Sequence, residues 1–264
     1  MPASTRSTSV ILQASRAQET LVRFLVTAAV IAGFAVVLAN YGPDFSNVWR
    51  YRSTYIKGLG VTLLVGFLAY ALALVLGLVV ATARLSRRVW ARHLADLYVE
   101  LVRGTPLLAQ IMIWRYGVAV MLGIHSKIAV GVLSLAVFAA AYIGEIIRAG
   151  IQSVDRGQLE AARSLGLSRW QTLRTVVLPQ ALRRMIPPLT SELINVVKDS
   201  SLLMVIGVGE LMWSARAAGA ASYDYFEGFL LAAAAYLVVT FSLSMFTRHL
   251  ERRLGRSERQ GVHL

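Results

Sequence analysis

The chain has 264 residues, no cysteine and a formal net charge of +13, and 56% of its residues are hydrophobic. That apolar share exceeds the about 45–50% that is typical of soluble domains, and the mean hydropathy is +0.60. The absence of cysteine excludes a disulfide framework, a thiol nucleophile and a cysteine-based metal site. We therefore interpret the chain as an all-α polytopic membrane protein.

Six transmembrane helices are expected, because several windows exceed the ~18 uncharged, mostly apolar residues that a spanning helix needs. A tail over residues 1–20 precedes an added N-terminal span and its external loop, which together cover residues 21–54. The membrane domain proper covers residues 55–250, and a basic tail covers residues 251–264. In chain order the six spans are Leu21–Ala39, Tyr55–Ala83, Thr105–Gly123, Ile128–Ile147, Pro187–Gly209 and Gly228–Thr247.

Positive charge gathers in alternate connections. Three Arg lie in or beside the N-terminal tail, five lie from Arg84 to Arg103, seven from Arg148 to Arg184 and five from Arg248 onward. The other connections carry Arg50, Arg52, Lys57, Lys127 and Arg216. The positive-inside rule then places both termini in the cytoplasm. Alternation of this kind indicates contact with membrane lipid, and it argues against the clustered basic patch of a nucleic-acid-binding protein.

A short Arg-rich stretch over residues 155–179, between the fourth and fifth spans, predicts a helical hairpin. Asp155 and Ser168 each stand three residues before a glutamine, which is the spacing of a helix start. Gly166 suits the left-handed residue that ends a first helix, and Pro179 is expected to end the second.

Two interpretations of the hairpin remain open on physical grounds alone. It is either a surface element resting on the helix bundle or a docking element for a partner protein at the membrane surface. In the second case Glu160 would meet a basic partner residue, and the small residues Ala161 and Ala162 would allow close backbone approach.

The segment Glu160-Ala161-Ala162, followed by Gly166 and Leu178-Pro179, resembles the EAA loop of the membrane subunits of binding-protein-dependent ABC importers. The surrounding sequence resembles the polar amino acid permease family in Glu100–Leu108, Gly150–Val154, Gly157–Gln158, Lys198–Leu202 and Ile206–Val208. The resemblance covers about residues 55–250. It implies a five-helix importer core, to which the first span is an addition. It also implies that a cytoplasmic coupling hairpin docks on an ATPase through Glu160, Ala161, Ala162, Gly166, Leu178 and Pro179.

The resemblance implies a division of labour among several chains. The sequence has no Gly-x-x-x-x-Gly-Lys-Ser/Thr phosphate loop, so ATP and magnesium are assigned to two partner ATPase subunits and no cofactor to this chain. A second permease chain, identical or homologous, and an extracytoplasmic solute-binding protein complete the expected importer. It would lie in a bacterial cytoplasmic (inner) membrane and carry polar amino acids or related compounds such as opines. The alternatives are a passive solute channel, which needs pore-lining rings but no docking hairpin, and an integral-membrane enzyme, for which no catalytic cluster is evident.

Lys198 and Asp199 interrupt the fifth span about a dozen residues after Pro187. Adjacent residues point in different directions on a helix, so each needs another partner or the helix breaks there. Ser200 could satisfy backbone groups freed by such a break. A purely structural break is one interpretation, and a role in the translocation pathway or its external gate is the other.

Three other ionisable residues fall within expected spans. Arg115 lies about ten residues into the third span; it could extend its long stem outward, form a structural pair, or bind a substrate carboxylate. Glu145 and Arg148 are expected to form a pair on the surface of the fourth span. Glu192 is left without a role.

Overall fold

The computed structural model describes residues 4–260, with side chains described for residues 18–19, 21–29, 32–46 and 49–249. Residues 4–260 are helical apart from short connections, and no strand occurs among them. The all-α fold class is therefore confirmed. The chain divides into two compact units, Met1–Asn47 and Val48–Leu264. Residues 1–3 and 261–264 of the two expected tails lie outside the described residues.

The first unit consists mainly of one helix, α1 (Ser4–Tyr41), which begins well before the expected first span. Its stretch Leu21–Tyr41 is long and apolar enough to cross a membrane. The helix is followed by the expected Pro-containing loop, in which the Asp44 side chain accepts a hydrogen bond from the Ser46 N–H at 2.8 Å. That bond opens the short helix α2 (Ser46–Arg50).

In the second unit, three helices are long and apolar enough to span a membrane: α3 (Arg52–Arg84), α7 (Lys127–Gln152) and the Tyr225–His249 part of α12 (Tyr225–Gln260). A fifth span arises if the segments Arg169–Ile206 and Leu211–Ser222, which meet at a 46° bend, count as one. The third expected span corresponds to a shorter apolar helical stretch, Leu107–Met121.

The remaining elements connect these spans. Between α3 and α7 lie α4 (Val89–Gly104), α5 (Leu107–Ile113), the π-helical turn η1 (Trp114–Val118) and α6 (Ala119–Met121). Between α10 and α12 lie the 3₁₀ helix η3 (Ser200–Ile206) and α11 (Leu211–Ser222). The hairpin region and the fifth span contain α8 (Arg156–Ser164), α9 (Arg169–Thr172), the π-helical turn η2 (Leu173–Val177) and α10 (Leu178–Asp199).

The helix α4 occupies a region that the sequence suggested only as a basic connection. One face of α4 carries Val99 and Val102, which are buried with Ala141 of α7. The other face is apolar and exposed. A helix with this pattern packs one side on its neighbours and leaves the other side to its surroundings.

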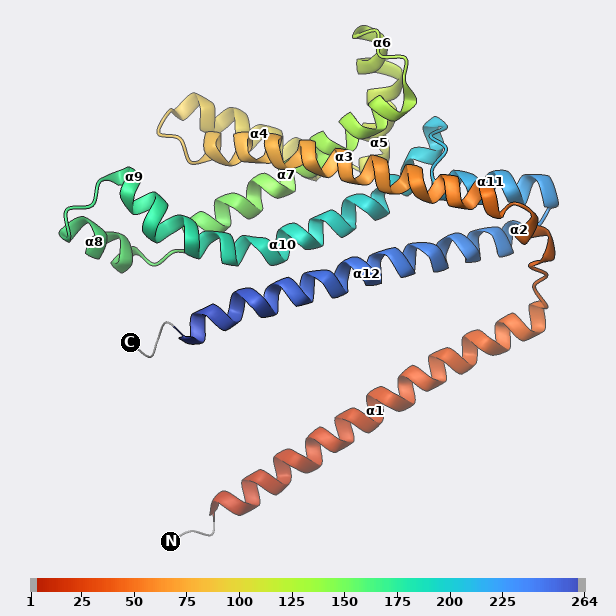
Figure 1. Cartoon of the computed structure of the whole chain (residues 1–264), viewed down its shortest axis with the longest axis horizontal. Coiled ribbons are helices and arrows are strands. Elements are labelled where there is room, and N and C mark those ends of the chain that lie inside the picture. The colour runs from red at the N-terminus through yellow and green to blue at the C-terminus, as the bar shows by residue number, and fades with distance from the viewer. Residues whose placement is uncertain (1–3, 261–264) are drawn as a thin grey trace. The chain divides into compact units, whose positions relative to one another are not determined.

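The core of the second unit is the seam between α3 and α7, which lie side by side (Figure 1). Small residues dominate the seam, and Ala69, Ala73, Ala139 and Ala140 are buried in it. At Gly77 the two helices approach so closely that an added Cβ would lie 2.5 Å from the Ile143 Cγ2 atom. Close approach through small residues is the usual packing mode of membrane helices, where burial of apolar surface gives little driving force.

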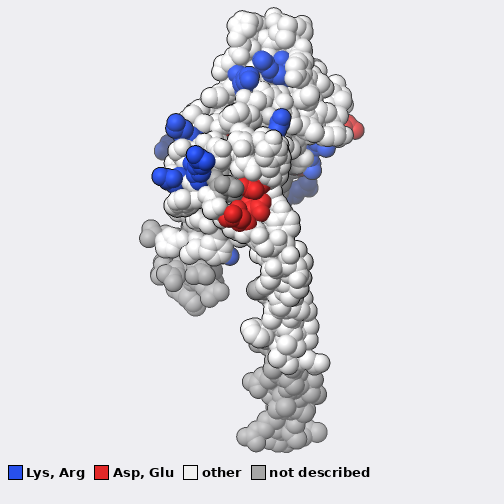
Figure 2. Space-filling model, turned by 90° about the vertical axis from the view of Figure 1, so that its right-hand side faces the viewer, with Lys and Arg blue, Asp and Glu red and all other residues white. Residues whose placement is uncertain are grey.

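The two ends of the second unit differ in charge. The hairpin of α8 and α9 forms one end, and α11 with the start of α12 forms the other (Figure 1). Seven Lys and Arg residues lie from Arg148 to Arg184 at the hairpin end. Figure 2, which looks onto the opposite end, shows basic residues spread over the surface and an acidic patch near the centre of the view.

The seam generates a stability prediction. Replacing Gly77 by Leu should destabilise the protein by about 1–3 kcal/mol, the usual range for overpacking a tight interface, because Ile143 cannot withdraw without disturbing α7. Gly60 on the same helix is the matched control, since an added Cβ there meets no heavy atom within 4 Å. The measurement is the free energy of unfolding in detergent micelles. Equal values for the Gly77→Leu and Gly60→Leu variants would show that the seam is looser than described.

Candidate functional site

The first arm of the hairpin has the predicted start and end. Asp155 caps α8 by accepting a hydrogen bond from the Gly157 N–H at 2.7 Å. After α8 the chain turns at Gly166, whose φ of +77° is left-handed. The Gly166 N–H donates to the Arg163 carbonyl at 2.9 Å, and the Leu167 N–H donates to the Ala162 carbonyl at 3.1 Å. These two bonds satisfy carbonyls that the helix end would otherwise leave free.

The second arm begins with the predicted capping box. The Ser168 hydroxyl accepts from the Gln171 N–H at 3.3 Å, and the Gln171 side chain accepts from the Ser168 N–H at 2.8 Å. This reciprocal pair fixes the start of α9. At the first arm, by contrast, Gln158 does not close a box on Asp155; its amide oxygen accepts a hydrogen bond from Gln180 at 2.5 Å, which ties α8 to α10.

The prediction that Pro179 ends the second arm is wrong. The helical turn widens at η2, where the Leu178 N–H donates to the Leu173 carbonyl five residues earlier. Pro179 follows in the first turn of α10, where the hydrogen-bond ladder is already shifted and a missing N–H is tolerated. Pro187 and Pro188, expected to start the fifth span, also lie inside α10. The second arm therefore runs without interruption into the span (Figure 1).

Two further contacts hold the hairpin against the ends of the spans. The Arg184 guanidinium donates to the Ser153 carbonyl, which joins α10 to the end of α7. Met185 packs so closely on Gly150 that an added Cβ at Gly150 would lie 2.2 Å from the Met185 Cγ atom. A displacement of the hairpin would therefore act on both α7 and α10.

The EAA residues divide between the inner and outer faces of α8. Ala162 is buried, with 3% of its surface exposed, whereas Glu160 and Ala161 are exposed. The Glu160 carboxylate makes no hydrogen bond or ion pair with any residue whose side chain is described. Gly166 is also exposed, with open space where a side chain would lie. The predicted docking residues thus present a carboxylate, unpaired among the described side chains, on the exposed face of the hairpin.

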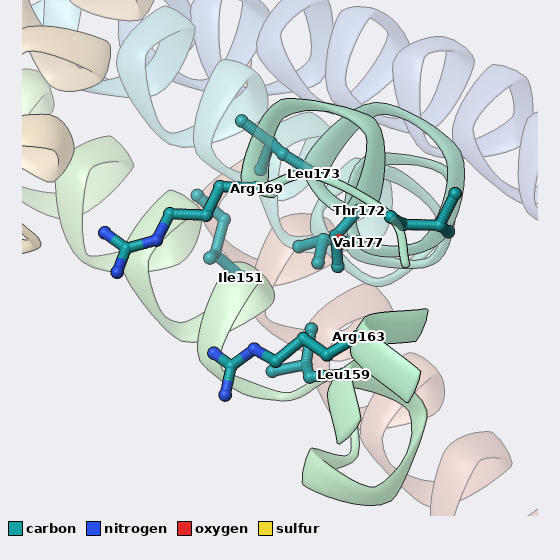
Figure 3. A pocket seen from close by; sticks show the side chains of 8 residues that line it. Ile151, Leu159, Arg163, Arg169, Thr172, Leu173 and Val177 are labelled. Atoms are coloured by element: carbon teal, nitrogen blue, oxygen red, sulfur yellow. The ribbon is translucent and has the colours of Figure 1, made fainter. Parts of the chain in front are cut away.

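A groove of about 240 Å³ lies between the two arms of the hairpin. Its walls are mainly apolar, from Ile151, Leu159 and Leu173. Figure 3 shows that the side chains of Arg163 and Arg169, one from each arm, extend toward the same open side of this groove. The hairpin therefore offers an apolar depression with basic residues at its rim, and Glu160 is exposed on the same arm as Arg163.

The expected interruption after Lys198 and Asp199 is present. The α-helix ends at Asp199 and continues as the 3₁₀ helix η3. The Ser200 hydroxyl donates to the Val197 carbonyl at 2.8 Å, so it satisfies a backbone group at the change of helix type, as expected. Lys198 is exposed, Asp199 is half-buried and Ser200 is fully buried.

Arg115 lies apart from this interruption, in the π-helical turn η1. It is half-buried, and its guanidinium forms no hydrogen bond or ion pair with the described side chains. No hydrogen bond joins it to Lys198, Asp199 or Ser200 within residues 49–249. Lys198, Asp199 and Ser200 thus lie in succession at one helix junction, and no hydrogen bond or ion pair among the described side chains joins Arg115 to them.

A charged network at the hairpin end was only partly foreseen. The predicted pair of Glu145 and Arg148 is present. Arg84 at the end of α3 also binds Glu145, and its Nε donates to Asp96 of α4 at 2.6 Å. The network therefore ties three helices together. Its members are 12 and 61 positions apart, so no local sequence spacing could have indicated it.

Glu210 is a second residue that sequence reasoning missed. It is fully buried and caps α11, accepting from the Met212 and Trp213 N–H groups at 2.8 and 2.7 Å. The Tyr236 hydroxyl of α12 donates to it at 3.0 Å. Glu192 is also buried and accepts from the Asn195 amide at 3.2 Å. For Glu210 the available signal was an acidic residue directly before a helix start, where carboxylates act as caps.

A bundle of apolar helices with a charged hairpin at one end has the form of a transporter's membrane subunit, and comparison with known proteins gives the family. Residues 73–256 match the model of the binding-protein-dependent transport system inner membrane component. The chain belongs to this family, and within it to the polar amino acid ABC permeases. It is a multi-pass inner-membrane protein.

Individual relatives support this assignment. The chain is 36% identical to the arginine transport system permease protein ArtQ of Bacillus subtilis (strain 168) and 37% identical to the glutamine transport system permease protein GlnP of Escherichia coli (strain K12). Each alignment covers 80% of this chain and 97% of the relative. The crystal structure of an amino acid ABC transporter with histidines contains a chain 38% identical to this one, with a TM-score of 0.75, and the match covers 80% of this chain and 98% of that chain. These relatives are transport subunits rather than enzymes, and a passive channel finds no support among them.

The turn between the arms generates a second prediction. Replacing Gly166 by Val should weaken the hairpin, because a left-handed backbone costs a non-glycine residue roughly 1–2 kcal/mol and β-branched residues tolerate it least. Asn at this position is the control, since Asn adopts this conformation more readily. Amide hydrogen exchange over residues 155–172 is the measurement, and we expect faster exchange in Gly166→Val than in Gly166→Asn. Equal protection in both variants would contradict the role assigned to the turn.

Proposed function

We propose that the chain is the translocation subunit of an ATP-driven importer for polar amino acids or related compounds such as opines. An extracytoplasmic solute-binding protein delivers the substrate, and two separate ATPase subunits bind ATP and magnesium and hydrolyse ATP. The names of the arginine and glutamine permeases support the substrate class. The chain's own sequence has no phosphate-binding loop.

The observation that carries this proposal is the continuous path from the hairpin into the fifth span. A partner that grips Glu160 and the groove between the arms would hold α8 and α9 as one piece. Because α9, η2 and α10 form one uninterrupted helical path, a displacement of the hairpin reaches Asp199 without passing through a flexible loop. ATP-driven closure of the two ATPase subunits would in this way switch the cavity between inward-facing and outward-facing states.

Lys198, Asp199 and Ser200 are proposed to line the pathway or its external gate. A polar amino acid carries an ammonium and a carboxylate, and Lys198 and Asp199 provide one group of each opposite sign at the junction. Charges at membrane depth are costly and are retained mainly where they face a cavity or a partner. Arg115, which has no ion-pair partner among the described side chains, is proposed as a further contact for a substrate carboxylate.

The assembly and orientation follow from the same reasoning. The active importer is proposed to contain two permease chains, either two copies of this one or this one with a homologue. The hairpin end, which carries the excess of Arg, is placed in the cytoplasm by the positive-inside rule. With the added first span, both termini are then cytoplasmic.

The coupling proposal predicts the behaviour of Glu160→Lys. This variant should insert normally but lose its ATPase, because leaving a desolvated ion pair without one partner typically costs about 3–5 kcal/mol and reversal adds repulsion. The two measurements are co-purification of the ATPase and the ATP hydrolysis that the solute-binding protein stimulates. Glu19→Lys is the control for charge reversal, since Glu19 is an exposed acidic residue in α1 that pairs with Arg23 of the same helix at 2.6 Å. Wild-type co-purification and wild-type stimulated ATP hydrolysis in Glu160→Lys would contradict the assignment of Glu160 to the docking surface.

The pathway proposal predicts a different pattern for Lys198→Ala and Asp199→Ala. Each variant should lower uptake of the amino acid by about tenfold or more, as expected when a charged contact worth at least 1.4 kcal/mol is lost. Assembly with the ATPase and binding of the solute-binding protein should remain. Both residues lie at the end of α10 that is remote from the hairpin. Transport into proteoliposomes and co-purification are measured in parallel. Normal uptake by both variants would remove these residues from the pathway.

A further inference from the structure

An apolar groove of about 350 Å³ lies between the end of α3 and the first half of α4. Trp90, Leu94 and Tyr98 recur every four residues along α4, so they form one stripe that follows the helix for two turns. The groove is lined by Val79, Val80, Ala83, Trp90, Leu94 and Tyr98, with Ala91 and Ala95 completing it. An apolar depression that follows α4 for two turns beside the end of α3 matches the polarity of a hydrocarbon chain.

Three arginines lie near the end of α4 at which this groove begins. Arg87 and Arg88 lie in the turn between α3 and α4, and Arg92 lies in the first turn of α4. All three are exposed, and none forms an ion pair with a described side chain. Their neighbour Arg84 differs, because Asp96 and Glu145 neutralise it. The start of α4, beside the groove, therefore carries three positive charges that no described side chain neutralises.

The exposed face of α4 indicates that lipid surrounds this groove. Five large apolar side chains on α4 are each more than half exposed: Val89, Trp90, Leu94, Leu97 and Leu101. Trp90, 61% exposed, lies at the same end as the arginines, and tryptophan is enriched where acyl chains meet headgroups. The polarity thus changes from basic to apolar along the groove in the same order as a phospholipid changes from headgroup to chain.

We propose that this groove is a binding site for an anionic phospholipid. One acyl chain fills the groove between α3 and α4, and the phosphate and headgroup bind Arg87, Arg88 and Arg92. Guanidinium groups suit this ligand because they contact phosphate oxygens through two parallel hydrogen bonds, and basic pockets between membrane helices on the cytoplasmic side bind anionic headgroups. The site depends on insertion of the helices in a membrane and is independent of the substrate and of the docking of the hairpin.

A lipid in this position would act on the packing of α4. Arg84 already joins α3 to α4 and α7 through Asp96 and Glu145. The acyl chain would fill the space between α3 and α4 beside that network, and the headgroup would reduce repulsion among the three arginines. Anionic lipid is therefore expected to stabilise the arrangement of these helices.

Native mass spectrometry of the purified importer complex tests the site directly. The complex is delipidated in detergent and titrated with phosphatidylglycerol or with phosphatidylcholine of the same acyl chains. We expect tighter binding of phosphatidylglycerol, and a loss of about a hundredfold when Arg87, Arg88 and Arg92 are all changed to Gln, since each Arg near an anionic headgroup contributes roughly fivefold. Equal affinity for the two lipids, or unchanged affinity in the triple variant, would overturn the proposal.

A charge-matched control separates this site from general attraction to the protein. Lys57, Lys127 and Arg216 are exposed cations near the opposite end of the spans, and changing all three to Gln should leave phosphatidylglycerol binding unchanged. An equal loss in this variant would show non-specific attraction and overturn the proposal.

The place of the acyl chain is tested through Trp90. Phosphatidylglycerol with brominated chains should quench wild-type fluorescence more than that of a Trp90→Phe variant, and a groove-filling Ala91→Phe variant should remove the difference. Equal quenching with and without Trp90 would place the lipid elsewhere. A crosslink from Leu94→Cys to a second permease chain in the assembled importer would show that protein fills the groove, and it too would overturn the proposal.

Discussion

The close packing of α3 on α7 is the constraint on which the other elements depend. Without a Cβ at Gly77, the two helices approach until the Ile143 Cγ2 atom lies 2.5 Å from where that Cβ would be. Dispersion contacts fall off steeply with distance, so such proximity provides attraction that burial of apolar surface cannot provide in lipid. The seam fixes the ends of both helices beside each other, and only then can Arg84 reach both Glu145 and Asp96. The position of α4, and of the chain that leaves α7 for the hairpin, follows from that arrangement.

The hairpin combines a rigid attachment with an unsatisfied surface. Its two arms are fixed by caps at Asp155 and Ser168 and by the left-handed turn at Gly166. Its exposed face nevertheless carries a carboxylate and two arginines without ion-pair partners among the described side chains. Rigidity lowers the entropic cost of binding, and free charges of both signs favour one orientation of a partner over others. These two properties together suit an element that transmits force between subunits.

Local chemistry could be predicted from the sequence, and its connection to the rest of the fold could not. The caps of the hairpin, the turn at Gly166 and the change of helix after Asp199 depend on residues within five positions of one another, so a linear reading finds them. Pro179 was misjudged because proline ends a regular α-helix, whereas the π-helical turn before it shifts the hydrogen bonds. The contact of Arg84 with Glu145 and the burial of Glu210 depend on helices that meet only in the folded chain. The first and last helices also extend beyond the ends that apolarity alone suggested.

The π-helical turn at Leu173–Val177 affects the direction in which this permease presents its hairpin. Relative to an α-helix, such a turn accommodates one extra residue, and each residue of an α-helix corresponds to a rotation of about 100°. The turn therefore sets the angle by which α9 is rotated about the axis of α10. A chain with one residue fewer here would keep every side chain of the hairpin but aim Trp170 and the arginines in a different direction. The direction in which the docking face points thus depends on how many residues the turn contains as well as on which residues they are.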